Sequence, residues 1–170
     1  NVMGQKSNVN IEFISANPTG PLTIGNGRGA FLGDALASIL AFAGNKVTRE
    51  YYINDAKAST QIQELGKAIL KRSKAYPGPY TDSVRARLKK KYPTLEKMDD
   101  AVVGYLTAQE IQKNNRNVIE KLLKIKFDVW YPEEKLYQNR LVQKTLNSLN
   151  RKGVMYEKDG AVWFRASEFG

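Results

Sequence analysis

Hydrophobic and polar positions follow two periods along the chain, and this pattern predicts strands separated by helices. Runs rich in β-branched and aromatic residues predict strands at residues 9–14, 46–53 and 127–131. Apolar residues at helical spacing predict a helix at residues 26–43 between the first two strands. The apolar positions of that helix are Leu32, Leu36, Ile39, Leu40 and Ala43. The strand–helix–strand order predicts a right-handed crossover and a parallel sheet, so the fold class is α/β.

Further helices are predicted at residues 58–72, 98–124 and 133–152. The apolar positions of the last two helices are Val102, Val103, Leu106, Val118, Leu122 and Leu123, then Leu141, Val142, Leu146 and Leu149. A basic insertion, irregular or helical, separates the first of these helices from the second. Near the end of the chain, an Asp-Gly pair at residues 159–160 predicts the turn of a β-hairpin.

The composition bounds the chemistry of the chain. Its 170 residues suit one domain with a sizeable core. Without cysteine or histidine, disulfides, thiol chemistry and histidine acid–base catalysis are excluded, and we expect no protein metal site. No apolar run approaches the roughly 20 residues that span a bilayer, and residues 1–6 show no apolar signal core. We therefore expect a cytoplasmic protein without a membrane partner.

The net charge of +10 is concentrated in one segment. Residues 67–97 hold ten basic and only two acidic side chains, whereas residues 1–66 hold five of each. Such a segment attracts polyanions such as nucleic acid, and it is equally typical of a solvated helical surface. If it binds RNA, the candidates are Lys89, Lys90 and Lys91, which would contact phosphates and not bases.

The segment Ser-Ala-Asn-Pro-Thr-Gly-Pro-Leu-Thr-Ile-Gly-Asn-Gly-Arg-Gly, residues 15–29, joins the first strand to the first helix. A loop at such a junction presents backbone N–H groups and a helix N-terminus to an anion. A dinucleotide fingerprint would need glycine at Ala30 or Leu32, and no Gly-Lys-Ser/Thr triplet of a phosphate-binding loop is present. Instead, Thr23 and Asn26 can donate hydrogen bonds to an oxyanion, and Gly25 leaves room for a base or sugar.

These residues resemble class I arginyl-tRNA synthetases, which read Ala-Asn-Pro-Thr-Gly-Pro-Leu-His-x-Gly-His-Gly-Arg-Gly at this place. The resemblance continues through Tyr-Tyr-Ile-Asn-Asp-Ala at residues 51–56 and is weakest at residues 75–97. It implies the first half of a Rossmann-like catalytic domain at residues 1–153, with the basic insertion at residues 74–97. Residues 154–170 would begin a connective insertion. We expect a piece of a larger enzyme that is inactive alone.

The resemblance also implies an ATP site, with Mg²⁺ bound to the nucleotide. The residues matched to ATP binding are Pro18, Pro21, Thr23, Gly25, Asn26 and Gly29. Thr23 and Asn26 stand where the family has its two histidines, and they are the candidate catalytic residues. Tryptophanyl-tRNA synthetases have Thr-x-Gly-Asn at this place, so we expect a working variant. Adenylation displaces pyrophosphate with an ionised carboxylate, so it needs no imidazole.

For the amino acid, the resemblance implies that arginine contacts Glu12, Ser15 and Asn17. A carboxylate can accept two hydrogen bonds from a guanidinium, and a buried acid needs a partner. Alternatively, Glu12 faces solvent on an edge strand and Asn17 caps the loop. The implied activity is ATP-dependent adenylation of arginine and its transfer to tRNA(Arg), by a protein that we expect to be a monomer. The alternative is a non-catalytic RNA-binding module on a synthetase-like fold.

Overall fold

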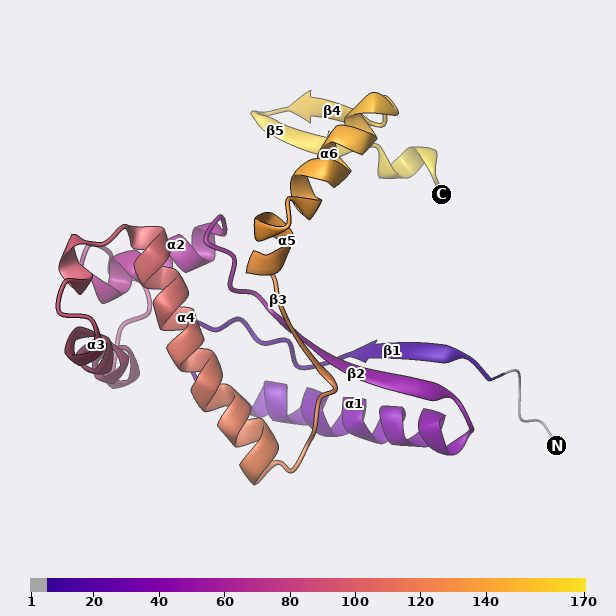
Figure 1. Ribbon diagram of the computed structural model, residues 1–170, viewed down its shortest axis with the longest axis horizontal. Helices are drawn as coiled ribbons and strands as arrows, with labels where there is room; N and C mark the ends of the chain where they lie inside the picture. Colours follow the sequence, from indigo (N-terminus) through magenta and orange to yellow (C-terminus); the bar gives the residue numbers. More distant parts are fainter. Residues whose placement is uncertain (1–5) are drawn as a thin grey trace. The chain divides into compact units, whose positions relative to one another are not determined.

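A computed structural model of the chain describes residues 6–170 (Figure 1). The described chain divides into two compact units, one ending at Glu134 and the other spanning Lys135–Gly170. The N-terminal stretch in which we expected no signal core lies outside the described residues, except for Lys6. The predicted domain boundary after residue 153 stays a prediction.

The first unit contains a three-stranded parallel sheet with the strand order β1-β2-β3. Its strands are β1 (Asn8–Glu12), β2 (Lys46–Ile53) and β3 (Val129–Pro132). Val9 of β1 lies beside Val47 of β2. The sheet confirms the three predicted strands and their parallel direction, and β2 has the predicted bounds.

Helix α1 (Ile24–Phe42) forms the crossover between β1 and β2 and lies along one face of the sheet (Figure 1). Small residues allow a close approach, because Ala30, Gly33 and Ala37 are its buried positions. A Cβ atom on Gly33 would lie 2.6 Å from the Cβ of Phe13, which leaves no room for a side chain. The predicted helix is therefore confirmed, and its sheet-facing side is the small-residue side.

The large apolar side chains of α1 are exposed, contrary to the core role that their spacing suggests. Leu32 is 73% exposed and Ile39 is 65% exposed. The other exposed members of this face are Ile24, Phe31, Leu36 and Phe42. In the described structure α1 buries its small-residue face, because that face lets the helix backbone approach the sheet closely. The spacing of large apolar residues does not predict this face. An apolar stripe of this size is typical of a contact surface.

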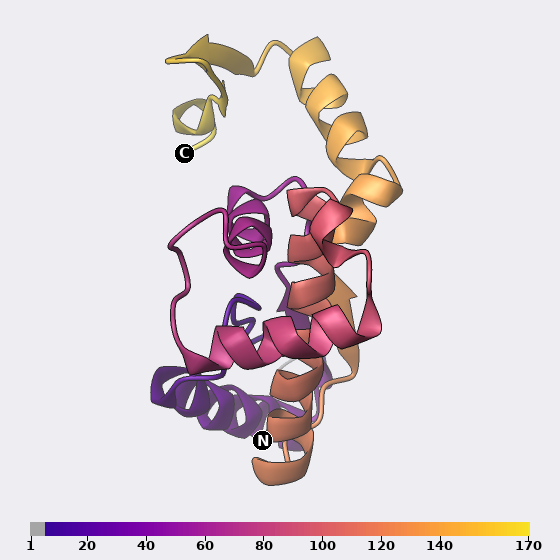
Figure 2. The same cartoon turned by 90° about the vertical axis from the view of Figure 1, so that its left-hand side faces the viewer.

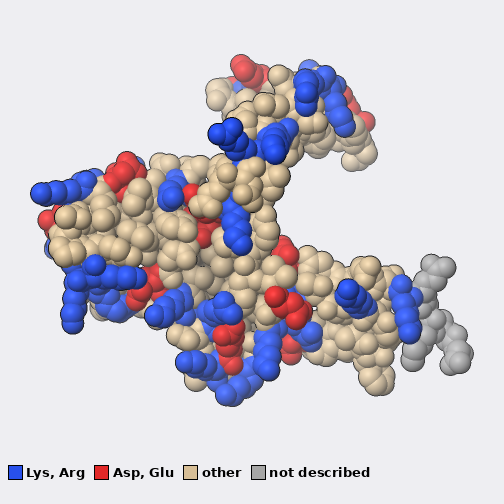
Figure 3. Space-filling view, viewed as in Figure 1, with Lys and Arg blue, Asp and Glu red and all other residues tan. Residues whose placement is uncertain are grey.

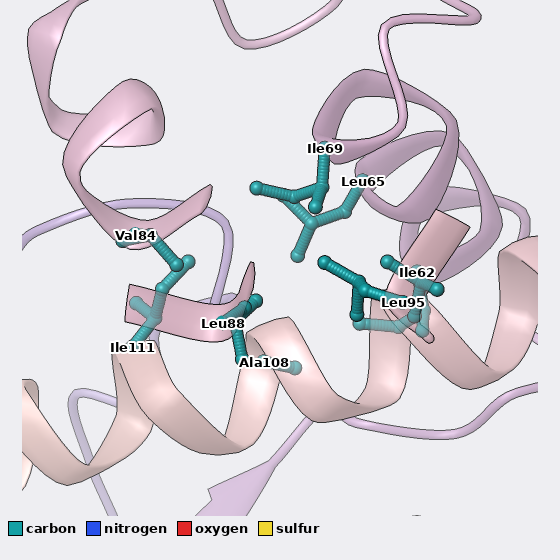
Figure 4. Close-up of a cluster of buried hydrophobic side chains, with 9 residues drawn as sticks. Ile62, Leu65, Ile69, Val84, Leu88, Leu95, Ala108 and Ile111 are labelled. Carbon is teal, nitrogen blue, oxygen red and sulfur yellow. The ribbon is translucent and has the colours of Figure 1, made fainter. Parts of the chain in front are cut away.

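The segment that follows β2 packs as a three-helix unit. It comprises α2 (Thr60–Ile69), α3 (Pro79–Lys91) and the first part of the long α4 (Asp100–Asn117). The predicted basic insertion at residues 74–97 is helical, because it contains α3 and a short 3-10 helix at Leu95–Lys97. α2 packs along α4, and α3 crosses them both (Figure 2). Figure 4 shows the buried cluster among these helices. Its members are Ile62, Leu65, Ile69, Val84, Leu88, Leu95, Val103, Ala108 and Ile111.

A second apolar cluster joins the sheet to the end of α4, which continues as a π-helix at Val118–Leu122. Its buried members are Phe13, Ala30, Tyr51, Ile53, Ile119 and Ile125. Two predicted apolar positions of this long helix are not in a core, since Leu122 is 74% exposed and Val102 is 37% exposed.

The helix predicted at residues 133–152 is wrong as a single helix. It is split into α5 (Glu134–Gln138) and α6 (Leu141–Arg151), because Arg140 adopts a left-handed conformation with φ 55°. No residue of α6 is buried, so its leucines form no core within the described chain. No glycine or proline marks the break, so the sequence pattern does not reveal it.

The hairpin is confirmed as β4 (Met155–Lys158) and β5 (Ala161–Phe164). Asp159 and Gly160 both have positive φ, 53° and 74°, as the favoured two-residue turn requires.

Candidate functional site

The loop between β1 and α1 begins with a strained turn. Ile14 has φ 67° and Ser15 has φ 35°, although neither is glycine. A positive φ is costly for a β-branched residue, and such strain persists only where surrounding contacts hold it. The loop therefore depends on neighbouring elements for its shape.

Ser15 continues the pairing of β1 with β2 after the β1 backbone turns away. Its Oγ accepts a hydrogen bond from the backbone N–H of Tyr52 at 3.0 Å, and its carbonyl accepts one from Asn54 Nδ2 at 3.1 Å. The hydroxyl proton of Ser15 is still available to a ligand. The structure thus gives Ser15 a role in loop geometry, and its predicted contact with arginine stays a prediction.

Tyr51 of β2 also holds this loop in place. Its ring is fully buried and stacks on Trp130 with the ring centroids 4.6 Å apart. Its hydroxyl accepts a hydrogen bond from the backbone N–H of Ala16 at 3.1 Å. Burial raises the pKa of the Tyr51 hydroxyl, while its contacts with Gln112 and Ala16 oppose the rise. Tyr51 is a packing residue whose hydroxyl holds the loop.

The start of α1 brings Thr23, Gly25 and Asn26 together in one helical turn. Thr23 is the N-cap, and its Oγ1 accepts from the backbone N–H of Asn26 at 3.3 Å. In return, Asn26 Oδ1 accepts from the backbone N–H of Thr23 at 2.8 Å and from its hydroxyl at 2.8 Å. This capping box gives a structural reason for the Thr-x-Gly-Asn wording that histidines would not provide.

Several hydrogen-bond donors at this helix start remain open. Within residues 6–170, nothing accepts a hydrogen bond from Asn26 Nδ2. The first-turn N–H groups of Ile24 and Gly25 have no acceptor within the helix. The helix dipole adds positive potential at the same place. These donors fit a phosphate group.

The glycines of this turn are not required by the protein's own packing. A Cβ on Gly25 would meet only Thr23 Oγ1, at 3.6 Å, and a Cβ on Gly29 would meet nothing within 4 Å. Pro18 is buried and Pro21 is exposed at the two ends of the proline-bearing segment. A need for glycine at position 25 would therefore come from a ligand.

Glu12 is exposed, so the expectation of a buried acid needing a partner is wrong. It lies at the end of β1 with Glu50 of β2 as its register partner. Both side chains belong to the sheet face opposite Tyr51, because strand residues alternate between faces. Adjacent like charges repel, and a bound cation would relieve that repulsion. Asn17 is also exposed, which leaves its side chain open to a ligand.

A cluster at the carboxyl ends of β2 and β3 was not recognised from the sequence. Asp55 is fully buried and accepts from the backbone N–H of Glu134 at 3.1 Å and from Gln109 Nε2 at 2.7 Å. Burial raises the pKa of the Asp55 carboxyl, and these two hydrogen bonds oppose the rise. Glu134 in turn pairs with Lys57 Nζ at 3.1 Å. Asp55 lies in the Tyr-Tyr-Ile-Asn-Asp-Ala run at residues 51–56, but no sequence pattern links it to Gln109 or Glu134.

The basic segment is partly neutralised by its own neighbours. Arg87 pairs with Glu110 at 3.1 Å, and Lys89 pairs with Glu96 at 2.5 Å. Within the described chain, no ion pair involves Lys90 or Lys91. Figure 3 shows Lys and Arg over α3 and over the carboxyl end of α4, with acidic side chains between them. No described contact joins the three candidate lysines to the loop.

In the part of the chain that the structure describes, no three His, Cys, Asp or Glu residues are grouped to hold a metal ion. No helix among residues 6–170 is long and apolar enough to cross a membrane.

No protein-family model matches the chain. Curated relatives do match it: arginine–tRNA ligases from Desulforamulus reducens and Desulfosudis oleivorans are 40% and 39% identical over 182 and 184 residues. Each match covers 99% of this chain, and 32% and 33% of those relatives respectively. The chain thus spans about a third of the length of the curated relatives it matches.

Solved structures agree in fold. An arginyl-tRNA synthetase structure from Campylobacter jejuni is 30% identical, with a TM-score of 0.74 over 98% of this chain and 39% of that one. The Thermus thermophilus arginyl-tRNA synthetase is 22% identical with a TM-score of 0.54, over 97% of this chain and 31% of that one, and supports the fold alone. Over the third of those relatives that it spans, the chain is similar in sequence and in fold to arginyl-tRNA synthetases.

Proposed function

We propose that this chain supplies the first half of the catalytic domain of an arginine–tRNA ligase. The whole protein adenylates arginine with ATP and transfers it to tRNA(Arg), in the cytoplasm and as a monomer. The observation that carries the proposal is the capped start of α1, where open donors face the end of β1 in a chain that resembles arginine–tRNA ligases throughout.

In the proposed site, the ATP phosphates lie at the start of α1. Asn26 Nδ2 and the N–H groups of the first turn donate to phosphate oxygens, and Thr23 holds Asn26 in place. The adenosine lies over Gly25. On one side it contacts Pro18 or Pro21, and on the other side it contacts Gly29. Mg²⁺ bound to the nucleotide would neutralise phosphate charge.

Arginine binds at the end of β1 in this proposal. The Glu12 carboxylate pairs with a cationic group of the substrate, and the neighbouring Glu50 strengthens the negative potential there. Ser15 and Asn17 donate to the substrate from the strained loop. The arginine carboxylate then forms a bond to the α-phosphorus as the bond to pyrophosphate breaks. No proton has to move, so the replacement of two histidines is compatible with the reaction.

The test is arginine-dependent ATP–pyrophosphate exchange by the full-length protein in the presence of tRNA. Gly25→Ala should raise the ATP KM, because the protein tolerates the methyl group and only the nucleotide meets it. Gly27→Ala is the matched control, since a Cβ there also meets nothing within 4 Å. Tight RNA binding without any exchange would instead favour a non-catalytic RNA-binding module.

A further inference from the structure

One face of α4 runs along the end of β2 and carries polar side chains where a helix of this position would be apolar. Tyr105, Gln109, Gln112 and Arg116 recur at intervals of four, three and four residues, which places them in one stripe. The contacts of three of them are Tyr105 with Lys57 Nζ at 4.7 Å, Gln109 with Asp55 at 2.7 Å, and Arg116 with the Trp130 ring at 4.7 Å. Three of its four members therefore contact β3 or the segment that follows β2.

Gln112 is the member of the stripe that lies beneath the substrate loop. Its side chain is 95% buried, with only 5% exposed, and it lies at the Tyr51 hydroxyl. Neither Oε1 nor Nε2 has a hydrogen-bond partner among the described residues. A buried amide without a hydrogen-bond partner is costly. The Tyr51 hydroxyl, on which Gln112 acts, accepts a hydrogen bond from the backbone N–H of Ala16.

Asn115 makes the second connection, one turn further along α4. It is 2% exposed, and its Nδ2 donates to the carbonyl oxygen of Gly20 at 3.2 Å. Gly20 stands between the proposed arginine residues and the start of α1. β2 therefore holds the first half of the loop, and α4 holds the second half.

We propose that Gln112 and Asn115 are positioning residues of the adenylation site. Gln112 acts through the Tyr51 hydroxyl on Ala16, and Asn115 acts directly on Gly20, so that the strained loop presents its ligands in one geometry. The inference rests on the proposed function for its kinetic consequence. Its structural consequence, protection of the loop by α4, does not depend on that function.

The first test is a double-mutant cycle in the full-length protein. Gln112→Met keeps the length of the side chain and removes the amide, and Tyr51→Phe removes the hydroxyl. Each single variant should lower kcat/KM of arginine-dependent pyrophosphate exchange by about three- to tenfold, the value of one hydrogen bond. Because both act on Ala16 through one contact, the double variant should lose no more than the single ones.

The role of Gln112 is overturned if the kcat/KM losses of the two single variants multiply in the double variant. It is also overturned if either single variant has wild-type kinetics.

The second test concerns Asn115. Asn115→Leu fills a similar volume without a donor, so packing is retained while the bond to Gly20 is lost. It should raise the KM values for arginine and ATP about three- to tenfold and increase hydrogen–deuterium exchange across residues 15–22. Asn117→Ala, an exposed position on the same helix, should change neither measurement.

If Asn115→Leu leaves hydrogen–deuterium exchange across residues 15–22 unchanged, the proposal is overturned, whatever the enzyme kinetics are. If the wild-type protein shows no pyrophosphate exchange with any amino acid, while Asn115→Leu still increases hydrogen–deuterium exchange of the loop, the proposed function fails and the positioning contact stands. If the wild type is active and Asn115→Leu has wild-type kinetics, the positioning role alone fails.

Discussion

The crossing of α2 and α4 depends on two glycines, and alanine at either should loosen the three-helix unit. A Cβ on Gly66 would lie 2.8 Å from the carbonyl carbon of Asp100 and 2.8 Å from the amide nitrogen of Gly104, and closer still to the Asp100 oxygen. A Cβ on Gly104 would likewise lie 2.8 Å from the carbonyl carbon of Ile62. These neighbours are backbone atoms of the facing helix, so no side chain can swing aside.

The size of the effect follows from these distances. Ordinary contacts of a Cβ begin at 3.4 Å, and the facing carbonyl oxygen is the closest atom, so the helices must separate by about 1.5 Å. Overpacking of this kind costs about 1–3 kcal/mol, and alanine's better helix propensity returns up to about 1 kcal/mol. We expect a net loss near 2 kcal/mol for Gly66→Ala or Gly104→Ala, and roughly 4–8 °C in the melting temperature of the unit.

The assay is thermal unfolding of the full-length protein, together with hydrogen–deuterium exchange of peptides from α2 and α4. Gly27→Ala is the control, because it gains helix propensity without a clash. Faster exchange confined to α2, α3 and α4 is the expected result. If Gly66→Ala melts at or above the temperature of the control, the close crossing of the helices is wrong.

Three further predictions concern the site and the insertion. Glu12→Ala should lower kcat/KM for arginine by about one to two decades, the roughly 1.5–3 kcal/mol of a charge-assisted contact, with little change in ATP KM; unchanged arginine kinetics would refute this contact. Replacing Lys89, Lys90 and Lys91 with glutamine should reduce the salt slope of tRNA binding by about two, because Lys89 is already paired, and an unchanged slope would leave them as solubility residues. Burial raises the pKa of the Asp55 carboxyl, so the folded state holds this proton more tightly than the unfolded state does. The free energy of unfolding should therefore fall as the pH rises from about 4 through the native pKa. Asp55→Asn should remove this fall, and parallel curves of unfolding free energy against pH for the two proteins would contradict the prediction.

Local sequence signals were enough for the sheet and the hairpin. The β-branched and aromatic residues of β2 prefer extended backbone, so the bounds of this strand follow from the sequence. The Asp159-Gly160 pair prefers positive φ, so the hairpin turn between β4 and β5 follows as well. The predicted start of α1 at residue 26 lies two residues after the observed start at Ile24, because Thr23 is the N-cap.

Tertiary contacts decided what the pattern could not. Spacing identified the large apolar residues of α1 but not that Gly33 would bring the opposite side against Phe13. The left-handed Arg140 has no sequence signature. In the site, the loop-holding roles of Ser15 and Tyr51 arise from contacts with residues more than 30 positions away, which no local motif reports.

The most direct test of the account is pyrophosphate exchange by the full-length protein with ATP, tRNA and one amino acid at a time. We expect pyrophosphate exchange with arginine, little with lysine, and a raised ATP KM in Gly25→Ala but not in Gly27→Ala. Exchange supported by another amino acid, or by none, would contradict the assignment of this site to arginine adenylation.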